Sequence, residues 1–463
     1  MKNRESTPSR SGRARNSLTS INTPIIAVIG FNLITLLVFV TAPVSWNTDN
    51  LLKLYALVLS CQVLILIGFQ LGRNRGLLTP PRRRLLFSRG DRLMPWLVGI
   101  YLCTFLTGYA YRMGFSTFDV VGMSKLLVAG IVDRHLGYET ALRGAGLGPT
   151  PWRVYFLISI FNQCFFIAGF LHWKKMNFRT RLLFGALVAV EAVFSLGRGT
   201  SFGVVSLVTT FVLSSLIWMR SRFGNLVLVF LLFLGSVALL SYNLYSRSGN
   251  VERAVELSEF GKSAIVVDHA ALSLVPASLL PTYVNVVSYL GGGYYHTALA
   301  FDLEFKSTYL VGNNPALIGL ASLCGLDVWE RTYMHRLQAK KDVDELGTWH
   351  SAYTWYASDV SFYGVPFVLL GVAYLFGFSW ARSVQGDFLS KIVFVILGNM
   401  LLFLFANNTY LSTVFYSFMF LLPLWVLTRL FGFLPGAPLK RPHSASIGAS
   451  QQIQVNASTE ALR

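Results

Sequence analysis

The chain has 463 residues, of which 54% are hydrophobic and only 13% are charged. A soluble domain carries about 25% charged residues, so this composition excludes a soluble globular domain and favours a membrane protein. The net charge of +18 would suggest nucleic acid as the partner of a soluble protein, but the basic residues are concentrated in alternate loops between apolar runs, which excludes that partner.

Ten apolar runs have about the length that a helix needs to cross a hydrocarbon layer of roughly 30 Å. Lipid satisfies no backbone hydrogen bond, so each run is predicted to be helical. The fold class is therefore an all-α integral membrane protein with about ten transmembrane helices. In chain order, the predicted spans are Thr23–Val44, Leu51–Gly72, Leu93–Tyr111, Trp152–Trp173, Leu182–Leu196, Ser201–Met219, Leu226–Tyr245, Val360–Trp380, Phe388–Ala406 and Thr413–Leu430.

Lysine and arginine predict the orientation, because loops rich in these residues stay in the cytoplasm. The two tails and the loops after the second, fourth, sixth and eighth spans, counted with the adjoining ends of the spans, hold 24 of the 39 basic residues and only four acidic ones. The loops on the other side, counted in the same way, hold the remaining 15 basic residues and 16 acidic ones, while Glu191 lies within a span. We therefore predict a multi-pass protein of a bacterial-type inner membrane with both termini in the cytoplasm.

The spans divide the chain into five parts. These are a disordered cytoplasmic tail (1–22), seven transmembrane helices (23–245), a large extracytoplasmic loop (246–359), three further helices (360–430) and a second cytoplasmic tail (431–463). Within the large loop, the interrupted apolar stretches LSLVPASLLPTYVNVVSYL and ALIGLASL are expected to form helices on the membrane surface, and Gly291–Gly293 is expected to form a flexible turn.

The hairpin SLGRGT, Ser195–Thr200, joins the fifth and sixth spans on the predicted outer side. Its glycines allow a sharp turn that exposes Arg198, whose planar guanidinium suits a lipid diphosphate; a solvated turn residue is the alternative. Glu191 precedes Arg198 by seven residues, or about 10 Å along a helix. An ionisable residue at this depth is a possible intramembrane polar site, and a structural hydrogen bond between helices explains it equally well.

The segment GTWHSAYTWYASDVSFYG, Gly347–Gly364, precedes the eighth span and is rich in aromatic residues. Trp349, Tyr353 and Trp355 fit an ordinary interfacial belt, and they also suit stacking on the apolar faces of sugar rings. His350 can accept a proton near neutral pH, which makes it a candidate general base.

Asp359 is a second candidate for the base. It lies nine residues after His350, on the opposite face if the segment is one helix, so the two are not expected to form a direct dyad. Asp359 also follows Ser358 at a predicted helix start, where capping would explain it equally well. In the large loop, Arg247 is the best candidate for a further diphosphate contact, because it lies just beyond the seventh span.

Motifs for nucleotide, dinucleotide or zinc binding do not occur, and the sequence offers no convincing set of metal ligands. The four cysteines lie far apart, without the spacing of a metal site or a disulfide framework. We therefore expect neither a cofactor nor a metal.

With SLGRGT, the large loop and the TWHSAYTWYASDVSFYG segment, the chain resembles the O-antigen and exopolysaccharide repeat-unit polymerases of the Wzy type. The resemblance covers most of the chain by topology, whereas the motifs amount to about 25 residues. It implies a glycosyltransferase-C-like architecture and the transfer of a growing glycan from undecaprenyl diphosphate to a new lipid-linked repeat unit on the outer face. Arg198 and Arg247 would then hold the diphosphate, and His350 or Asp359 would act as base.

The resemblance also implies partners: the lipid-linked oligosaccharide, membrane lipids, and candidate proteins such as a chain-length regulator and a flippase. Two other functions fit the same features. An O-antigen ligase shares the architecture and uses an outer-loop arginine and histidine. A transporter or flippase of a polar lipid-linked substrate would also use Glu191 and cationic loops, although it rarely needs so large an outer loop.

Overall fold

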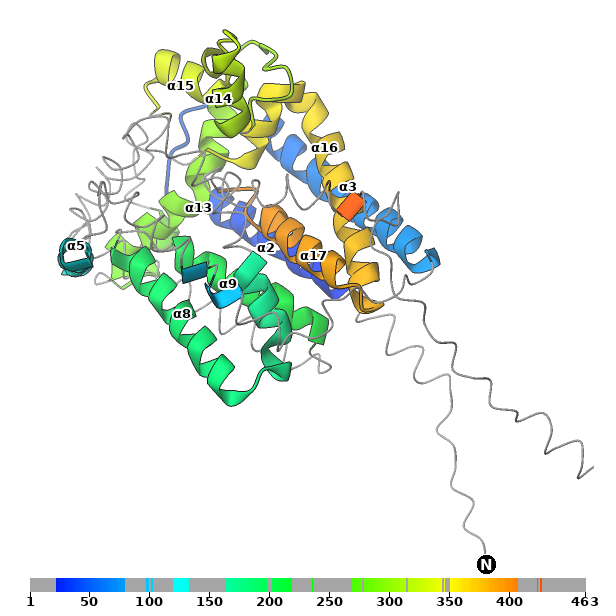
Figure 1. Cartoon of the computed structure of the whole chain (residues 1–463). Helices are drawn as coiled ribbons and strands as arrows, with labels where there is room; N and C mark the ends of the chain where they lie inside the picture. The colour runs from blue at the N-terminus through cyan, green and yellow to red at the C-terminus, as the bar shows by residue number, and fades with distance from the viewer. Residues whose placement is uncertain are drawn as a thin grey trace, which may run out of the picture.

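A computed structural model describes part of the chain, and in that part all the regular elements are helices (Figure 1). Apart from five single positions, the described residues are 22–79, 97–99, 101–102, 120–132, 164–197, 202–218, 269–276, 279–313, 315–343 and 350–406. The helices are α2 (Thr23–Val40), α3 (Leu51–Leu78), α5 (Val120–Val132), η2 (Trp173–Lys175), α8 (Phe178–Gly197), α9 (Phe202–Trp218), α12 (Ala270–Ser273), α13 (Leu280–Ala300), α14 (Pro315–Leu323), η4 (Trp329–Arg331), α15 (Tyr333–Lys341), α16 (Ala352–Val384) and α17 (Phe388–Leu402).

Four helices, α2, α3, α8 and α16, are long and apolar enough to cross a membrane, and α9 and α17 are shorter apolar helices. The chain is thus a helical membrane protein. These six helices correspond to the predicted first, second, fifth, eighth, sixth and ninth spans in the order just given. Large side chains such as Leu37 (60% exposed) and Val63 (57% exposed) point outward from α2 and α3, as lipid-facing residues do. Most of the predicted third, fourth, seventh and tenth spans and nearly all of both tails lie outside the described residues.

Helices α3 and α16 pack so closely that glycine is required at their contact. A Cβ on Gly68 would lie 2.3 Å from the carbonyl oxygen of Leu370, and one on Gly72 would lie 1.8 Å from that of Tyr374. On α16, a Cβ on Gly377 would lie 2.1 Å from a carbonyl oxygen of α3. Small residues spaced four apart allow this approach of two helices within a membrane. Residue numbers rise together along the contact, so the helices are parallel, as the predicted topology requires of the second and eighth spans.

Basic residues gather at one end of the bundle, which we call the basic end. Arg382 near the end of α16 donates a hydrogen bond of 2.7 Å to the carbonyl of Thr79, directly after α3. The ring of His172, which precedes η2, packs 5.0 Å from that of Phe388 at the start of α17. The residues of the basic end are Arg73, Arg75, Lys174, Lys175, Arg181 and Arg382. Segments predicted to face the same side of the membrane therefore meet at one end.

Helix α13 enters the core of the bundle instead of lying on a surface. Residues 291–300 are all buried, and α13 packs against α2, α3, α15 and α16. Gly291–Gly293 is part of this helix, so the expected flexible turn is wrong. The reason is a tertiary contact: a Cβ on Gly293 would lie 2.0 Å from the carbonyl oxygen of Phe405. The glycines thus serve close packing. The expectation of a surface helix also fails for this half of α13.

The close contact of α3 and α16 predicts unequal effects of the same substitution. Gly72→Ala places a methyl group against a backbone carbonyl, which cannot move aside without separating the helices, so it should lower the free energy of unfolding by about 3 kcal/mol. Gly371→Ala on α16 meets no atom within 4 Å and serves as the control, with unchanged or slightly higher stability. Thermal unfolding of both variants in detergent measures the difference in stability. Equal midpoints would contradict the packing described here.

Candidate functional site

The candidate site lies where the start of α16 and the two residues before it meet α13. The side chain of Ser351 caps α16 by accepting the N–H of Thr354 at 3.3 Å, and the N–H of Ala352 donates to the carbonyl of Leu404 at 2.9 Å. The helix is broken at Ser361, which has a φ of 62°. The helix therefore begins eight residues before the predicted Val360. Capping does not explain Asp359, because Ser351 is the cap.

Five buried polar residues form a cluster where α13 meets the start of α16, and we call it the His–hydroxyl cluster. The rings of His296 and His350 lie 5.3 Å apart between centroids. Beside them, the Thr297 hydroxyl lies 2.5 Å from that of Ser351 and 2.9 Å from that of Thr354. All five side chains are at most 2% exposed. Burying polar groups costs free energy unless they are bonded, and hydrogen bonds join the hydroxyls of Thr297, Ser351 and Thr354. The two histidines meet through their rings.

The cluster supplies two kinds of chemistry. An imidazole can accept and return a proton near neutral pH, and hydroxyl groups can both donate and accept hydrogen bonds. It lies away from the basic end, because α3 and α16 run in parallel from this side of the bundle to the basic end. In Figure 1, α14 and α15 lie beside the start of α16 at the same end.

The aromatic candidates for sugar stacking lie in different surroundings. Tyr353 is fully buried, stacks on Tyr294 at 6.3 Å between ring centroids, and accepts a hydrogen bond of 3.3 Å from Gln62. It is a core residue. The ring of Trp355 lies 6.1 Å from that of Trp329, and its indole N–H has no hydrogen-bond partner in the described part of the chain. Trp349 lies outside the described residues.

Asp359 holds a loop. One carboxylate oxygen accepts the N–H of Gly312 at 2.8 Å and the hydroxyl of Thr308, and the other accepts the N–H of Asn313 at 3.2 Å. The side chain is 6% exposed. These donors come from the segment after α13 and not from α16. All three contacts hold the segment after α13 against α16, so the geometry of Asp359 favours a structural role.

Glu191 and its neighbours are placed only in part. Glu191 is half-buried and accepts a hydrogen bond of 2.8 Å from the hydroxyl of Tyr101. A structural hydrogen bond of this kind was one of the two explanations that the sequence offered for Glu191. Near the predicted hairpin, the hydroxyl of Ser195 accepts the N–H of Gly203 at 3.0 Å and holds the ends of α8 and α9 together. Arg198 and Arg247 lie outside the described residues.

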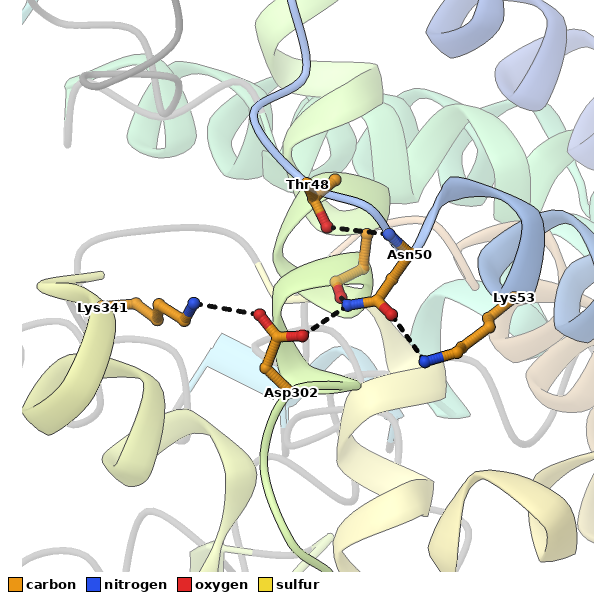
Figure 2. Close-up of polar contacts among 6 residues, drawn as sticks. Thr48, Asn50, Lys53, Asp302 and Lys341 are labelled. Carbon is orange, nitrogen blue, oxygen red and sulfur yellow. Dashed lines mark hydrogen bonds and ion pairs between the residues drawn. The ribbon is translucent and has the colours of Figure 1, made fainter.

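A polar network braces the same end of the bundle (Figure 2). The amide nitrogen of Asn50, at the start of α3, donates to Asp302 at 2.6 Å and to the carbonyl of Ala298 at 3.3 Å. Lys341 of α15 donates to the other oxygen of Asp302 at 2.9 Å, and Lys53 donates to Asn50 at 2.8 Å. Burial raises the pKa of Asp302, but the bonds from Lys341 and Asn50 and the charges of Lys341 and Lys53 outweigh it, so the net pKa is lowered. The network ties α3, α13 and α15 together beside the cluster.

The sequence analysis did not identify His296 and Thr297. Both follow the triple glycine in GGGYYHTALA, and the signal that could have found them is the change from small residues to His-Thr on one helix. This change of residue type indicates a site only once α13 is known to enter the core beside His350.

No family model, no curated protein and no solved structure matches the chain. The fold and the cluster define its class: a helical membrane protein with a buried polar site near one end of its bundle.

The role of Asp359 predicts the effect of replacing it. Asp359→Asn puts an amide N–H₂ against backbone N–H donors, so at least one of them loses its acceptor, at a cost of about 1–3 kcal/mol. Thr308→Val should cost less, and the double variant should cost less than the sum, because both changes break the same contact. Chemical unfolding in detergent measures all three. A stable Asp359→Asn protein that makes no product would contradict a structural role and indicate a base.

Proposed function

We propose that this chain is a membrane glycosyltransferase that polymerises undecaprenyl-diphosphate-linked repeat units into O-antigen or exopolysaccharide. In this proposal the chain has about ten spans in a glycosyltransferase-C-like arrangement, with both termini in the cytoplasm and residues 246–359 largely outside. The observation that carries the proposal is the His–hydroxyl cluster. Ionisable and polar residues are costly in a membrane protein and are expected to serve function.

The location of the cluster also supports the proposal. Basic residues mark the cytoplasmic side of membrane proteins, and those of the basic end form one group. At the opposite end basic residues also occur, but Lys341 there pairs with Asp302 and Lys53 with Asn50. The cluster lies toward the opposite end, where lipid-linked sugars arrive after they have been flipped outward. Trp355 adds a buried indole N–H without a partner among the described residues, a donor that a sugar hydroxyl could satisfy.

The proposed reaction uses His350 as general base. A hydroxyl of the new repeat unit attacks the anomeric carbon of the growing chain, and the bond from that carbon to the diphosphate oxygen breaks. His350 takes the hydroxyl proton, and undecaprenyl diphosphate leaves with the electron pair, stabilised by Arg198 and Arg247. His350 is preferred to Asp359 because the carboxylate of Asp359 is already occupied by the loop.

The test is the length of the sugar chains made by a strain that lacks the gene and carries a variant. General-base catalysis contributes roughly 10²–10⁴-fold, so His350→Ala should leave mainly single repeats at an unchanged protein level. His335→Ala is the matched control, because this half-exposed histidine of α15 pairs with Glu345 and should be tolerated.

Other outcomes identify the alternatives. Full-length polymer that is not attached to its final acceptor would indicate a ligase, and lipid-linked repeats trapped on the cytoplasmic side would indicate a flippase. Normal polymer from His350→Ala would refute the assignment of the base.

A further inference from the structure

A strained turn follows α13 and exposes the side chains of Tyr309 and Leu310 at the protein surface. The N–H of Val311 donates to the carbonyl of Thr308 at 3.2 Å, which closes a turn with Tyr309 and Leu310 at its centre. Their φ angles are 57° and 64°. Positive φ at both central positions is characteristic of type I′ turns, in which Asn and Gly are strongly preferred. Tyrosine and leucine are therefore unfavourable residues for this backbone.

The rest of the protein holds the turn in place. The N–H of Thr308 donates to the carbonyl of Ser358 at 3.3 Å, and Asp359 accepts the N–H of Gly312 and the Thr308 hydroxyl. The strain is thus imposed by contacts with α16. Most of the side-chain surface at the tip is left unpacked, because Tyr309 is 56% exposed and Leu310 is 67% exposed. Backbone strain that stability does not require indicates a function for these side chains.

The level of the turn along α16 indicates what these side chains contact. The turn is fastened at Asp359, and Tyr363 follows four residues later, directly after the break at Ser361. Tyr363 is 90% exposed and Phe367, one further turn along, is 69% exposed on a helix long enough to cross the membrane. Exposed tyrosine is typical of the boundary between lipid and water. The turn therefore lies at the level where α16 enters the bilayer.

The chemistry of the tip agrees with that level. The guanidinium of Arg331 lies 4.8 Å above the ring of Tyr309 and donates a hydrogen bond to its hydroxyl. Phe305 (40% exposed) and the exposed Lys306 precede the turn. Apolar side chains next to cations match the boundary between acyl chains and anionic headgroups.

We propose that the turn Thr308–Val311 is a lipid-surface contact, in which Tyr309 and Leu310 insert among the headgroups and upper acyl chains while Arg331 faces lipid phosphate. The contact positions the segment between α13 and α16 against the bilayer. Asp359 then serves as the residue that fixes this turn to the membrane-spanning helix.

The direct test measures depth in nanodiscs of phosphatidylethanolamine and phosphatidylglycerol. A nitroxide is attached to Leu310→Cys in full-length protein with Cys61, Cys103, Cys164 and Cys324 replaced. Lys340→Cys on α15 is the aqueous reference and Phe367→Cys the lipid reference, since both native residues are exposed. The label at 310 should meet oxygen more and water-soluble nickel complex less than the label at 340, approaching the label at 367. Nickel access equal to that at 340 would overturn the proposal, and so would low access to both reagents, which would mean that protein covers the turn.

A second measurement keeps the proposal falsifiable if the label itself perturbs the turn. The double variant Tyr309→Asn/Leu310→Gly supplies the residues that this backbone prefers and removes the apolar tip. Its midpoint of thermal unfolding in detergent should equal or exceed that of the wild type. A clear decrease would show that Tyr309 and Leu310 are kept for internal packing, and it would contradict a lipid role.

Discussion

The close parallel contact between α3 and α16 is the constraint on which the rest of the described structure depends. Glycines at positions such as 68, 72 and 377 bring two backbones together where any side chain would separate them. Lipid tails are as apolar as the helices, so the hydrophobic effect does not drive helices together within a membrane. Dispersion contacts between closely packed small residues drive this association instead. The contact fixes the height and rotation of α16, which carries Thr354, Trp355 and Asp359 and directly follows His350 and Ser351.

The first part of α16 then organises one end of the bundle. Its Ser351 and Thr354 bond to Thr297 of α13, its Ser358 accepts the N–H of Tyr333 from α15, and its Asp359 fastens the turn after α13. A single helix thus connects the His–hydroxyl cluster and the lipid-contacting turn. The break at Ser361 separates this polar, fully enclosed part from the lipid-facing part that follows.

The parts of the fold set by local composition were predictable from the sequence. Apolar runs identified six of the described helices, and α17 even begins at the predicted Phe388. The start of α16 was missed because its first turns, AYTWYASD, are aromatic and polar. Such a pattern is typical of the boundary between membrane and water, and the sequence does not show which segments bury it. Gly293 was misread because glycine favours turns, whereas here the carbonyl of Phe405 leaves no room for a Cβ.

The candidate site was predictable only in part, because its members come from distant segments. His350 could be identified from its residue type and its position before a span, but His296 required the path of α13. Asp359 could be identified from its residue type and position, but its contacts could not, since its donors lie 46 to 51 residues earlier in the chain. Such pairs carry no signal in one sequence, because neither spacing nor periodicity links them.

The most direct test of the proposed activity is a reaction with purified protein in liposomes and a defined undecaprenyl-diphosphate-linked repeat unit. Mass spectrometry of the lipid extract should show glycans of two, three and more repeats, with one free undecaprenyl diphosphate released for each bond formed and no nucleotide or added metal required. Unchanged substrate in the presence of folded protein, with no free lipid diphosphate released, would contradict glycosyl transfer as the function of this chain.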